Sequence, residues 1–90
     1  MIEIRDIHGK LLATIEADTL EFADLSEMDL SYADLRGANL RHANLYFTNF
    51  EFADLRGADL LHARTYGTKF GGSNCEGAKR RHKHYRPHYM

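Results

Sequence analysis

From Leu20 onward, nearly every fifth residue is apolar, and this spacing constrains the fold more than any other feature of the sequence. The central positions of the repeat are occupied by Leu20, Leu25, Leu30, Leu35, Leu40, Leu45, Phe50, Leu55, Leu60, Thr65, Phe70 and Cys75. A small residue, most often Ala, stands two positions before the centre, and Asp or Asn usually stands one position before it. The repeat therefore reads A-(D/N)-L-x-x and occurs about twelve times in succession.

Neither an α-helix nor a flat β-strand explains a period of five residues. Five residues advance an α-helix by about 500°, so the leucines would spread over every face of the helix. A strand sends side chains that are five residues apart to opposite faces of a sheet. A chain that turns by roughly a right angle after every repeat does fit, because the central and small residues then all face inward. Four such turns close a square coil of about twenty residues.

A second, longer repeat supports this coil length. Residues 33–43, ADLRGANLRHA, match residues 53–63, ADLRGADLLHA, at nine of eleven positions. The two segments are twenty residues apart, which is the separation that places equivalent side chains in adjacent coils. The sequence thus indicates the expected coil length twice, once by four repeats of five residues and once by the repeat at a separation of twenty residues.

On these motifs, the chain resembles the pentapeptide-repeat family over about residues 18–78. The resemblance implies an all-β fold, namely a right-handed quadrilateral β-helix. Residues 18–78 would form about three coils, which at about 4.8 Å per coil give a column roughly 15 Å tall. Each coil buries its apolar side only by stacking on its neighbours, so the two ends of the column need covers.

The N-terminal segment, residues 1–17, is expected to form a β-hairpin that caps the first coil. Apolar and polar residues alternate on both sides of a turn at residues 8–10, as in two paired strands. The apolar set of this alternation is Ile2, Ile4, Leu11, Ala13 and Ile15. Such a cap would prevent unwanted end-to-end pairing of the first coil.

At the other end, Arg80 falls on the next central position, and a charged side chain does not fill an interior site cheaply. We therefore expect the β-helix to stop near Ala78 and residues 79–90 to form a basic, flexible tail. The sequence offers no obvious C-terminal cap. Either the last coil packs against another chain, for example in a homodimer, or the tail folds back over it with Tyr85, Pro87 and Tyr89.

Charge is unevenly distributed along the sequence. Residues 1–19 carry two basic and four acidic side chains, residues 20–77 carry five and nine, and residues 78–90 carry five and none. The basic tail residues are Lys79, Arg80, Arg81, Lys83 and Arg86, and Tyr85 lies among them. This tail could contact phosphates and stack on bases, or it could be a solvated tail that docks on an acidic partner surface.

The twenty-residue separation also predicts columns of outward-facing side chains. His42 and His62 fall in one column above Phe22, and we interpret this column as stacking that follows from the duplicated sequence rather than as a metal site. Tyr32 and Phe52 share another column, with Phe47 on the neighbouring edge. These three aromatic residues are candidates for a partner-binding surface. Alternatively, and with equal weight, these rings only stack on one another and stiffen the edge of a sheet, without binding a partner.

The sequence gives no sign of catalytic chemistry, a metal or a cofactor. Its carboxylates stand mostly before the leucines, where Asp and Asn serve turn hydrogen bonds, and no residue set predicts a nucleophile with a base. Cys75 is the single cysteine and is expected to be a small buried apolar residue. No targeting segment and no long apolar stretch is evident, so we expect a cytoplasmic protein that does not enter a membrane.

Two classes of function remain open. The first is a rigid, non-enzymatic scaffold or interaction module for a protein partner that the sequence does not identify. The second follows from the resemblance, because some pentapeptide-repeat proteins mimic duplex DNA and bind type II topoisomerases such as DNA gyrase. Duplex DNA carries one charge per ~1.7 Å, whereas residues 20–77 have a net charge of −4 over a column of roughly 15 Å. Nucleic-acid contact through the basic tail is a further possibility, which the acidic body would oppose.

Overall fold

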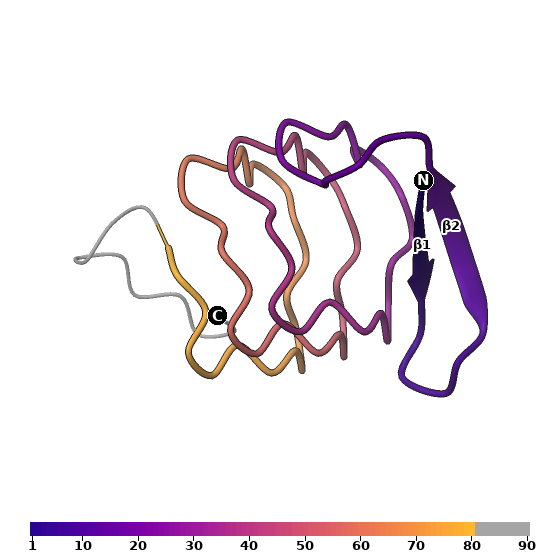
Figure 1. Ribbon diagram of the computed structural model, residues 1–90. Coiled ribbons are helices and arrows are strands. Elements are labelled where there is room, and N and C mark those ends of the chain that lie inside the picture. Colours follow the sequence, from indigo (N-terminus) through magenta and orange to yellow (C-terminus); the bar gives the residue numbers. More distant parts are fainter. Residues whose placement is uncertain (81–90) are drawn as a thin grey trace.

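The computed structural model describes residues 1–80 and shows a column of stacked coils with a β-hairpin at its N-terminal end (Figure 1). Strands β1 (Ile2–Arg5) and β2 (Leu11–Ile15) form the hairpin. They pair antiparallel, with Ile2 opposite Ile15 and Ile4 opposite Ala13. The rest of the described chain winds into a β-helix-like column, and residues 1–80 contain no α-helix.

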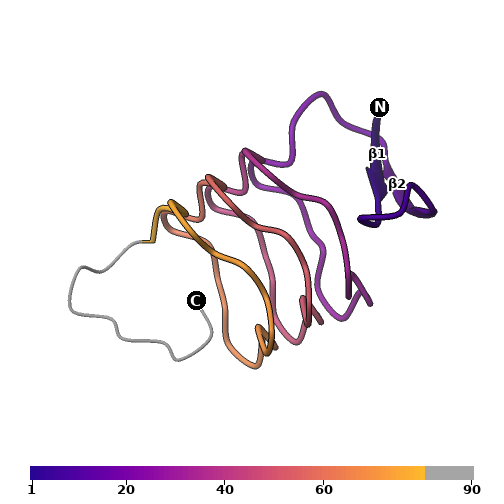
Figure 2. The same cartoon turned by 90° about the horizontal axis from the view of Figure 1, so that it is seen from below.

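The coils are joined by parallel backbone pairing between residues that are twenty positions apart. Asp34 pairs with Asp54, and Asp54 pairs in turn with Asn74. Backbone hydrogen bonds run in both directions between coils. For example, the Leu25 N–H donates to the Asn44 carbonyl at 3.0 Å, and the Asn44 N–H donates to the Ala23 carbonyl at 2.8 Å. Figure 2 shows the resulting stack from below, with the hairpin set against its first coil.

Each repeat ends in a tight turn that changes the direction of the chain. The N–H of the small residue donates to the carbonyl of the central residue three positions earlier, as Ala33 does to Leu30 at 3.1 Å. The second outer residue of the turn has a positive φ, between 59° and 64° in the non-glycine residues and 67° to 73° in the glycines of the column. A positive φ at this position is the mark of a type II turn.

The Asp or Asn before each centre stabilises the next turn. Its side-chain oxygen accepts a hydrogen bond from the N–H two residues later, as Asn49 does from Glu51 at 2.8 Å and Asp54 does from Arg56 at 3.2 Å. This Asx turn explains why so many carboxylates and amides occur at one position of the repeat. Arg64, Lys69 and Lys79 stand at this position in the last coil.

The interior of the column is filled by the central residues. Leu25, Leu45 and Phe50 are fully buried, and Phe50 stacks on Phe70 with ring centroids 5.8 Å apart. Thr48 is the buried polar residue of this core, and its hydroxyl donates to the Leu25 carbonyl at 2.9 Å. The core thus runs continuously through the coils along the column axis.

The hairpin contacts the first coil through both its core and its backbone. Ile4 is only 2% exposed and belongs to the same buried cluster as the leucines. The Ile7 N–H donates to the Tyr32 carbonyl at 2.8 Å, and the Asp34 N–H donates to the Arg5 carbonyl at 2.8 Å. These bonds attach the hairpin to one side of the first coil.

The alternation expected in β2 is wrong at Leu11, which is 45% exposed. The cause is an irregularity in the strand pairing, because Ala13 faces Ile4 while Leu11, rather than Leu12, faces Arg5. An extra residue in one strand reverses the side to which the preceding side chains point. Leu12 therefore packs against the core in the place that the sequence pattern suggested for Leu11.

Candidate interaction surface

Backbone pairing between residues twenty positions apart aligns every fourth repeat along the column, so the repeats fall into four rows, which we treat as faces with the turns as the corners between them. We call the faces A, B, C and D in chain order, each defined by the small, Asp/Asn and central positions of successive coils. Their residues are 23–25, 43–45 and 63–65 for A; 28–30, 48–50 and 68–70 for B; 33–35, 53–55 and 73–75 for C; and 38–40, 58–60 and 78–79 for D. The two outer residues of each repeat lie at the corners.

The corner between faces D and A carries a stack of three rings. Phe22 and His42 lie 4.6 Å apart between ring centroids with an interplanar angle of 4°, and His42 and His62 lie 4.9 Å apart at 19°. All three residues have the positive φ of the turn. Since an L-residue pays about 1–2 kcal/mol in this conformation, ring stacking offsets part of the strain. The three side chains remain exposed at the surface.

The next two corners are also aromatic. Between faces A and B, Tyr66 makes edge-to-face contacts with Tyr46 at 6.1 Å and with Phe47 at 5.5 Å. Between faces B and C, Tyr32 stacks on Phe52 at 5.2 Å. These corners leave much of each ring in contact with water: Phe47 is 56% exposed and Phe52 is 54% exposed.

Two glycines allow these phenylalanine rings to lie against the last coil. A Cβ atom on Gly72 would come within 2.5 Å of the Phe52 ring, and one on Gly67 would come within 2.5 Å of the Phe47 ring. Each ring therefore covers the backbone of a glycine that is twenty residues later in the chain. In this way Tyr32, Phe52 and Gly72 form one continuous column, and Phe47 and Gly67 form another.

The fourth corner, between faces C and D, has no aromatic residue in the described chain. It carries Gly37 and Gly57 beside Arg36 and Arg56. Arg36 pairs with Asp34 at 2.9 Å, and Arg56 pairs with Asp54 at 2.6 Å. The hydrogen bond from the neighbouring arginine lowers the pKa of each aspartate. This corner is a solvated surface whose charges neutralise one another.

The structure therefore brings Tyr32, Phe47 and Phe52 to the two edges of face B. Tyr32 and Phe52 do form the stacked pair that the sequence left as an alternative, and they stay half exposed while doing so. The sequence interpretation missed Tyr46 and Tyr66 as part of the same aromatic surface. Their twenty-residue separation is the signal that could have identified them.

The charged candidates of the C-terminal segment lie only partly within the described residues. Lys79 and Arg80 are exposed at the end of the column, and the Lys79 N–H donates to the Ala58 carbonyl at 2.8 Å. Arg81, Lys83, Tyr85 and Arg86 lie outside the described residues. The partner-binding prediction for the tail therefore stays a prediction.

The net negative charge of residues 20–77 is distributed as a gradient along the axis of the column. Residues 20–39 carry one basic and five acidic side chains, residues 40–59 carry two and three, and residues 60–79 carry three and one. The gradient arises at the Asx positions, where aspartate in the first coil gives way to Arg64, Lys69 and Lys79 in the last. The acidic end is the hairpin end, and the basic end is the C-terminal one.

Neither the histidines nor the cysteine forms a reactive centre within residues 1–80. No group of three or more His, Cys, Asp or Glu side chains in this range is placed to hold a metal ion. Cys75 is half-buried, with its Sγ 3.3 Å from the Ser73 Oγ. Burial raises the pKa of the Cys75 thiol, which disfavours the reactive thiolate.

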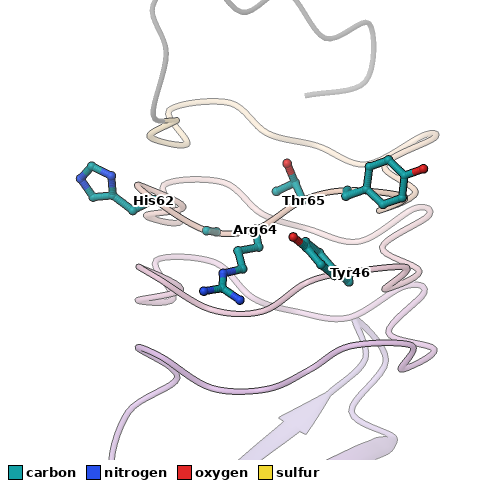
Figure 3. A pocket seen from close by; sticks show the side chains of 6 residues that line it. Tyr46, His62, Arg64 and Thr65 are labelled. Carbon is teal, nitrogen blue, oxygen red and sulfur yellow. The ribbon is translucent and has the colours of Figure 1, made fainter.

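A shallow, open hollow lies on face A at the basic end of the column. It is lined by Tyr46, His62, Ala63, Arg64, Thr65 and Tyr66. In Figure 3, the Arg64 side chain extends from its coil toward the coil below, Tyr46 lies on one flank, and His62 points away on the other. The hollow is a surface feature that suits contact with another molecule better than enclosure of a small substrate.

Comparison with known proteins agrees with this geometry. The family description "Pentapeptide repeats" matches eight copies of the repeat within residues 23–61. A crystal structure of a pentapeptide repeat protein from the cyanobacterium Cyanothece 51142 is 36% identical, with a TM-score of 0.67 over 69% of this chain. This chain covers 43% of the length of that protein.

Another pentapeptide repeat protein, from Nostoc Pcc 7120, is 29% identical, with a TM-score of 0.34 over 70% of this chain and 76% of its own. No curated protein matches the sequence. Within residues 1–80, no helix has the length and apolar character needed to cross a bilayer.

Proposed function

Because the chain belongs to the pentapeptide-repeat family, we propose that it is a rigid, non-enzymatic interaction module that binds a protein partner through face B. The observation that carries this proposal is the placement of exposed aromatic side chains on both edges of that face. Phe47 lies at one edge, and Tyr32 and Phe52 lie at the other. Exposed aromatic residues are over-represented at the centres of protein interfaces.

Rigidity supports this role. The backbone of each coil is bonded to its neighbours, and the aromatic side chains are held by stacking or by contact with a glycine. A surface that is ordered before binding loses less conformational entropy when the complex forms. Face B also carries Asp29, Asn49 and Lys69 in one column, so a partner can meet both charges between the two aromatic edges.

The finer description of the scaffold is part of the same proposal. We infer a right-handed quadrilateral β-helix of about three coils over residues 18–78, with the hairpin of residues 1–17 as its cap and residues 79–90 as a separate basic tail. The pairing at twenty-residue separation and the insertion of Ile4 into the core support this description. A cytoplasmic location, expected from the sequence, belongs to this proposal as well.

A pull-down from native extract tests the role of face B. The triple variant Tyr32→Ser/Phe47→Ser/Phe52→Ser should lose most of the captured partner, while its circular dichroism spectrum stays that of the folded column. The matched control, Arg36→Ser/Arg56→Ser, alters the opposite corner and should capture the partner as the unaltered protein does. Equal capture by both variants would contradict the assignment of face B.

A chain ending at Ala78 separates the column from the tail. Equal capture by this shortened chain and the full chain supports binding by the column. Loss of capture, together with steeply salt-dependent binding of nucleic acid by the full chain, favours the tail. A dimeric mass in solution for the full chain and a monomeric mass for the shortened chain would instead favour a homodimer in which residues 79–90 take part at the C-terminal end of the column.

Inhibition of a type II topoisomerase through DNA mimicry is the second candidate for the column. Its support is the family, and the charge gradient weighs against it, since the last coil carries Arg64, Lys69 and Lys79. Duplex DNA presents negative charge along its whole length. A supercoiling assay with purified gyrase decides this candidate, and absence of inhibition at large molar excess would end it.

A further inference from the structure

The charges on face A change from negative to positive along the column. At the Asp/Asn position of its three repeats stand Asp24, Asn44 and Arg64, which from the hairpin end to the C-terminal end are negative, neutral and positive. A second column turned end over end therefore presents the opposite order of charges. The backbones of Asp24 and Asn44 pair directly, as do those of Asn44 and Arg64. The three side-chain positions therefore lie in line along the axis.

Both charged groups of this column are available to another molecule. Asp24 accepts hydrogen bonds from the Ser26 N–H at 3.0 Å and hydroxyl at 2.6 Å, which lower the pKa of the carboxyl group and keep it ionised near neutral pH. Neither Asp24 nor Arg64 has an ion pair within residues 1–80.

The arginines of the first two coils, unlike Arg64, form ion pairs within the column. Arg36, Arg41 and Arg56 each pair with an aspartate, at 2.9, 3.2 and 2.6 Å. Arg64 occupies an Asx position in the lining of the shallow hollow, and within residues 1–80 its guanidinium group makes no ion pair, which leaves its five donors to an outside acceptor. An anionic group on a partner is therefore the ligand that this position fits.

We propose that face A binds face A of a second copy of this chain, with the two columns side by side and antiparallel. A twofold axis at the level of Asn44 then places each Asp24 opposite Arg64 of the second copy. The contact is self-complementary, as a twofold interface must be. It goes beyond the proposed function, because it uses face A and leaves face B to the protein partner.

The corners of face A are complementary in the same antiparallel register. At the D/A corner, the column Phe22, His42, His62 sets Phe22 of one copy against His62 of the other. At the A/B corner, the column Ser26, Tyr46, Tyr66 sets the small Ser26 against the large Tyr66. Phe22 is 69% exposed and Tyr66 is 72% exposed, so both rings have surface to bury in the contact. Aromatic side chains are enriched in such interfaces.

Two other arrangements of a pair of columns have less favourable contacts. Parallel columns would place Asp24 on Asp24 and Arg64 on Arg64, and like charges across an interface are strongly unfavourable. On face B the antiparallel arrangement also pairs Asp29 with Lys69, but Glu51 would meet Glu51 at the twofold level. The glycines at positions 67 and 71 also leave the two corner positions at the end of that face without side chains.

The expected dimer is weak and sensitive to salt. A single face of about three coils buries an area at the low end of specific interfaces, below about 1,200 Å² in total. Exposed ion pairs are screened within about 8–10 Å at ordinary ionic strength. The average mass should therefore rise from 10.4 kDa toward twice that value as the protein is concentrated, and the rise should diminish in high salt.

Sedimentation equilibrium of the full chain and two charge variants tests the proposal. Asp24→Arg and Arg64→Asp each create a like-charge pair in the homodimer and should weaken self-association at least about tenfold. A 1:1 mixture of the two variants restores an opposite-charge pair at both positions, so the mixture should associate as well as the unaltered chain. Lys69→Asp on face B is the matched control and should leave self-association unchanged.

The mixture distinguishes this arrangement from association through the column end, where the two variants would not rescue one another. The proposal is overturned if the unaltered chain stays monomeric up to about 1 mM, if either variant associates like the unaltered chain, or if the mixture stays monomeric. Thermal unfolding of each variant verifies that the column is folded. Partner capture by face B is read separately, so the two proposals can fail independently.

Discussion

Gly72 and Gly37 provide a matched pair of positions that differ in one physical respect. Both glycines occupy the positive-φ position of a turn, with φ of 71° and 67°. A Cβ atom at position 37 would meet no atom within 4 Å, whereas one at position 72 would lie 2.5 Å from the Phe52 ring. Substitution by alanine therefore separates backbone strain from the loss of ring packing.

The expected free-energy costs follow from these geometries. Gly37→Ala should lower the free energy of unfolding by about 1 kcal/mol, the cost of a left-handed conformation for a residue with a Cβ. Gly72→Ala carries the same cost and also displaces the Phe52 ring from the glycine and from its stack on Tyr32 at 5.2 Å. Loss of that ring packing adds about 1 kcal/mol, for a total of about 2 kcal/mol.

Thermal unfolding followed by circular dichroism measures the difference. For a domain of this size, about 1 kcal/mol corresponds to a Tm shift of about 4–8 °C, so Gly72→Ala should melt that much below Gly37→Ala. In a Phe52→Ala background the extra cost should vanish, leaving the two substitutions equal. Equal Tm values in the unaltered background, or an extra cost that persists without Phe52, would refute the reasoning.

Three further substitutions test other parts of the column. Thr48→Val removes the buried hydroxyl that donates to the Leu25 carbonyl at 2.9 Å, and a urea titration should show a loss of about 1 kcal/mol. Lys69→Asn supplies the missing turn acceptor and should raise the Tm, by an amount equivalent to about 0.5–1 kcal/mol; an unchanged or lower Tm would count against the Asx account. Hydrogen bonds from neighbouring arginines lower the pKa values of Asp34 and Asp54 in the folded state. Their stabilising contribution is therefore present above about pH 4 and is lost as the pH falls through the folded pKa values. The variant Asp34→Asn/Asp54→Asn should show a smaller fall in Tm from about pH 5 to about pH 3, and an identical fall would exclude these carboxylates as its source.

The sequence predicts the family and the aromatic columns because both depend only on spacing. The period of five residues and the longer repeat of twenty residues assign Tyr32 and Phe52 to one column, and the two rings do stack. The same spacing assigns His42 and His62 to another, with ring centroids 4.9 Å apart. Residue type explains the Asx turns equally well, because Asp and Asn can accept a hydrogen bond from the backbone two residues on.

Other features depend on three-dimensional pairing that local patterns do not encode. Leu11 and Leu12 look interchangeable in the sequence, and only the pairing with Ile4 and Arg5 shows which of them faces the core. The net charge of residues 20–77 conceals the charge gradient, because Asp24 and Arg64 belong to different coils. Positive φ at the corners is suggested by the glycines but masked by bulky residues such as Phe52 at equivalent positions.

Hydroxyl-radical footprinting of the protein captured with its partner tests most directly whether binding occurs at the aromatic edges of face B. Exposed aromatic side chains report on all three aromatic corners, and the hairpin residue Leu11, at 45% exposure, reports on the N-terminal end of the column. Compared with the protein alone, oxidation of Tyr32, Phe47 and Phe52 should fall together, and oxidation of Leu11 should not change. Protection of Leu11 or of residues 79–90, with Tyr32, Phe47 and Phe52 still oxidised, would contradict the account.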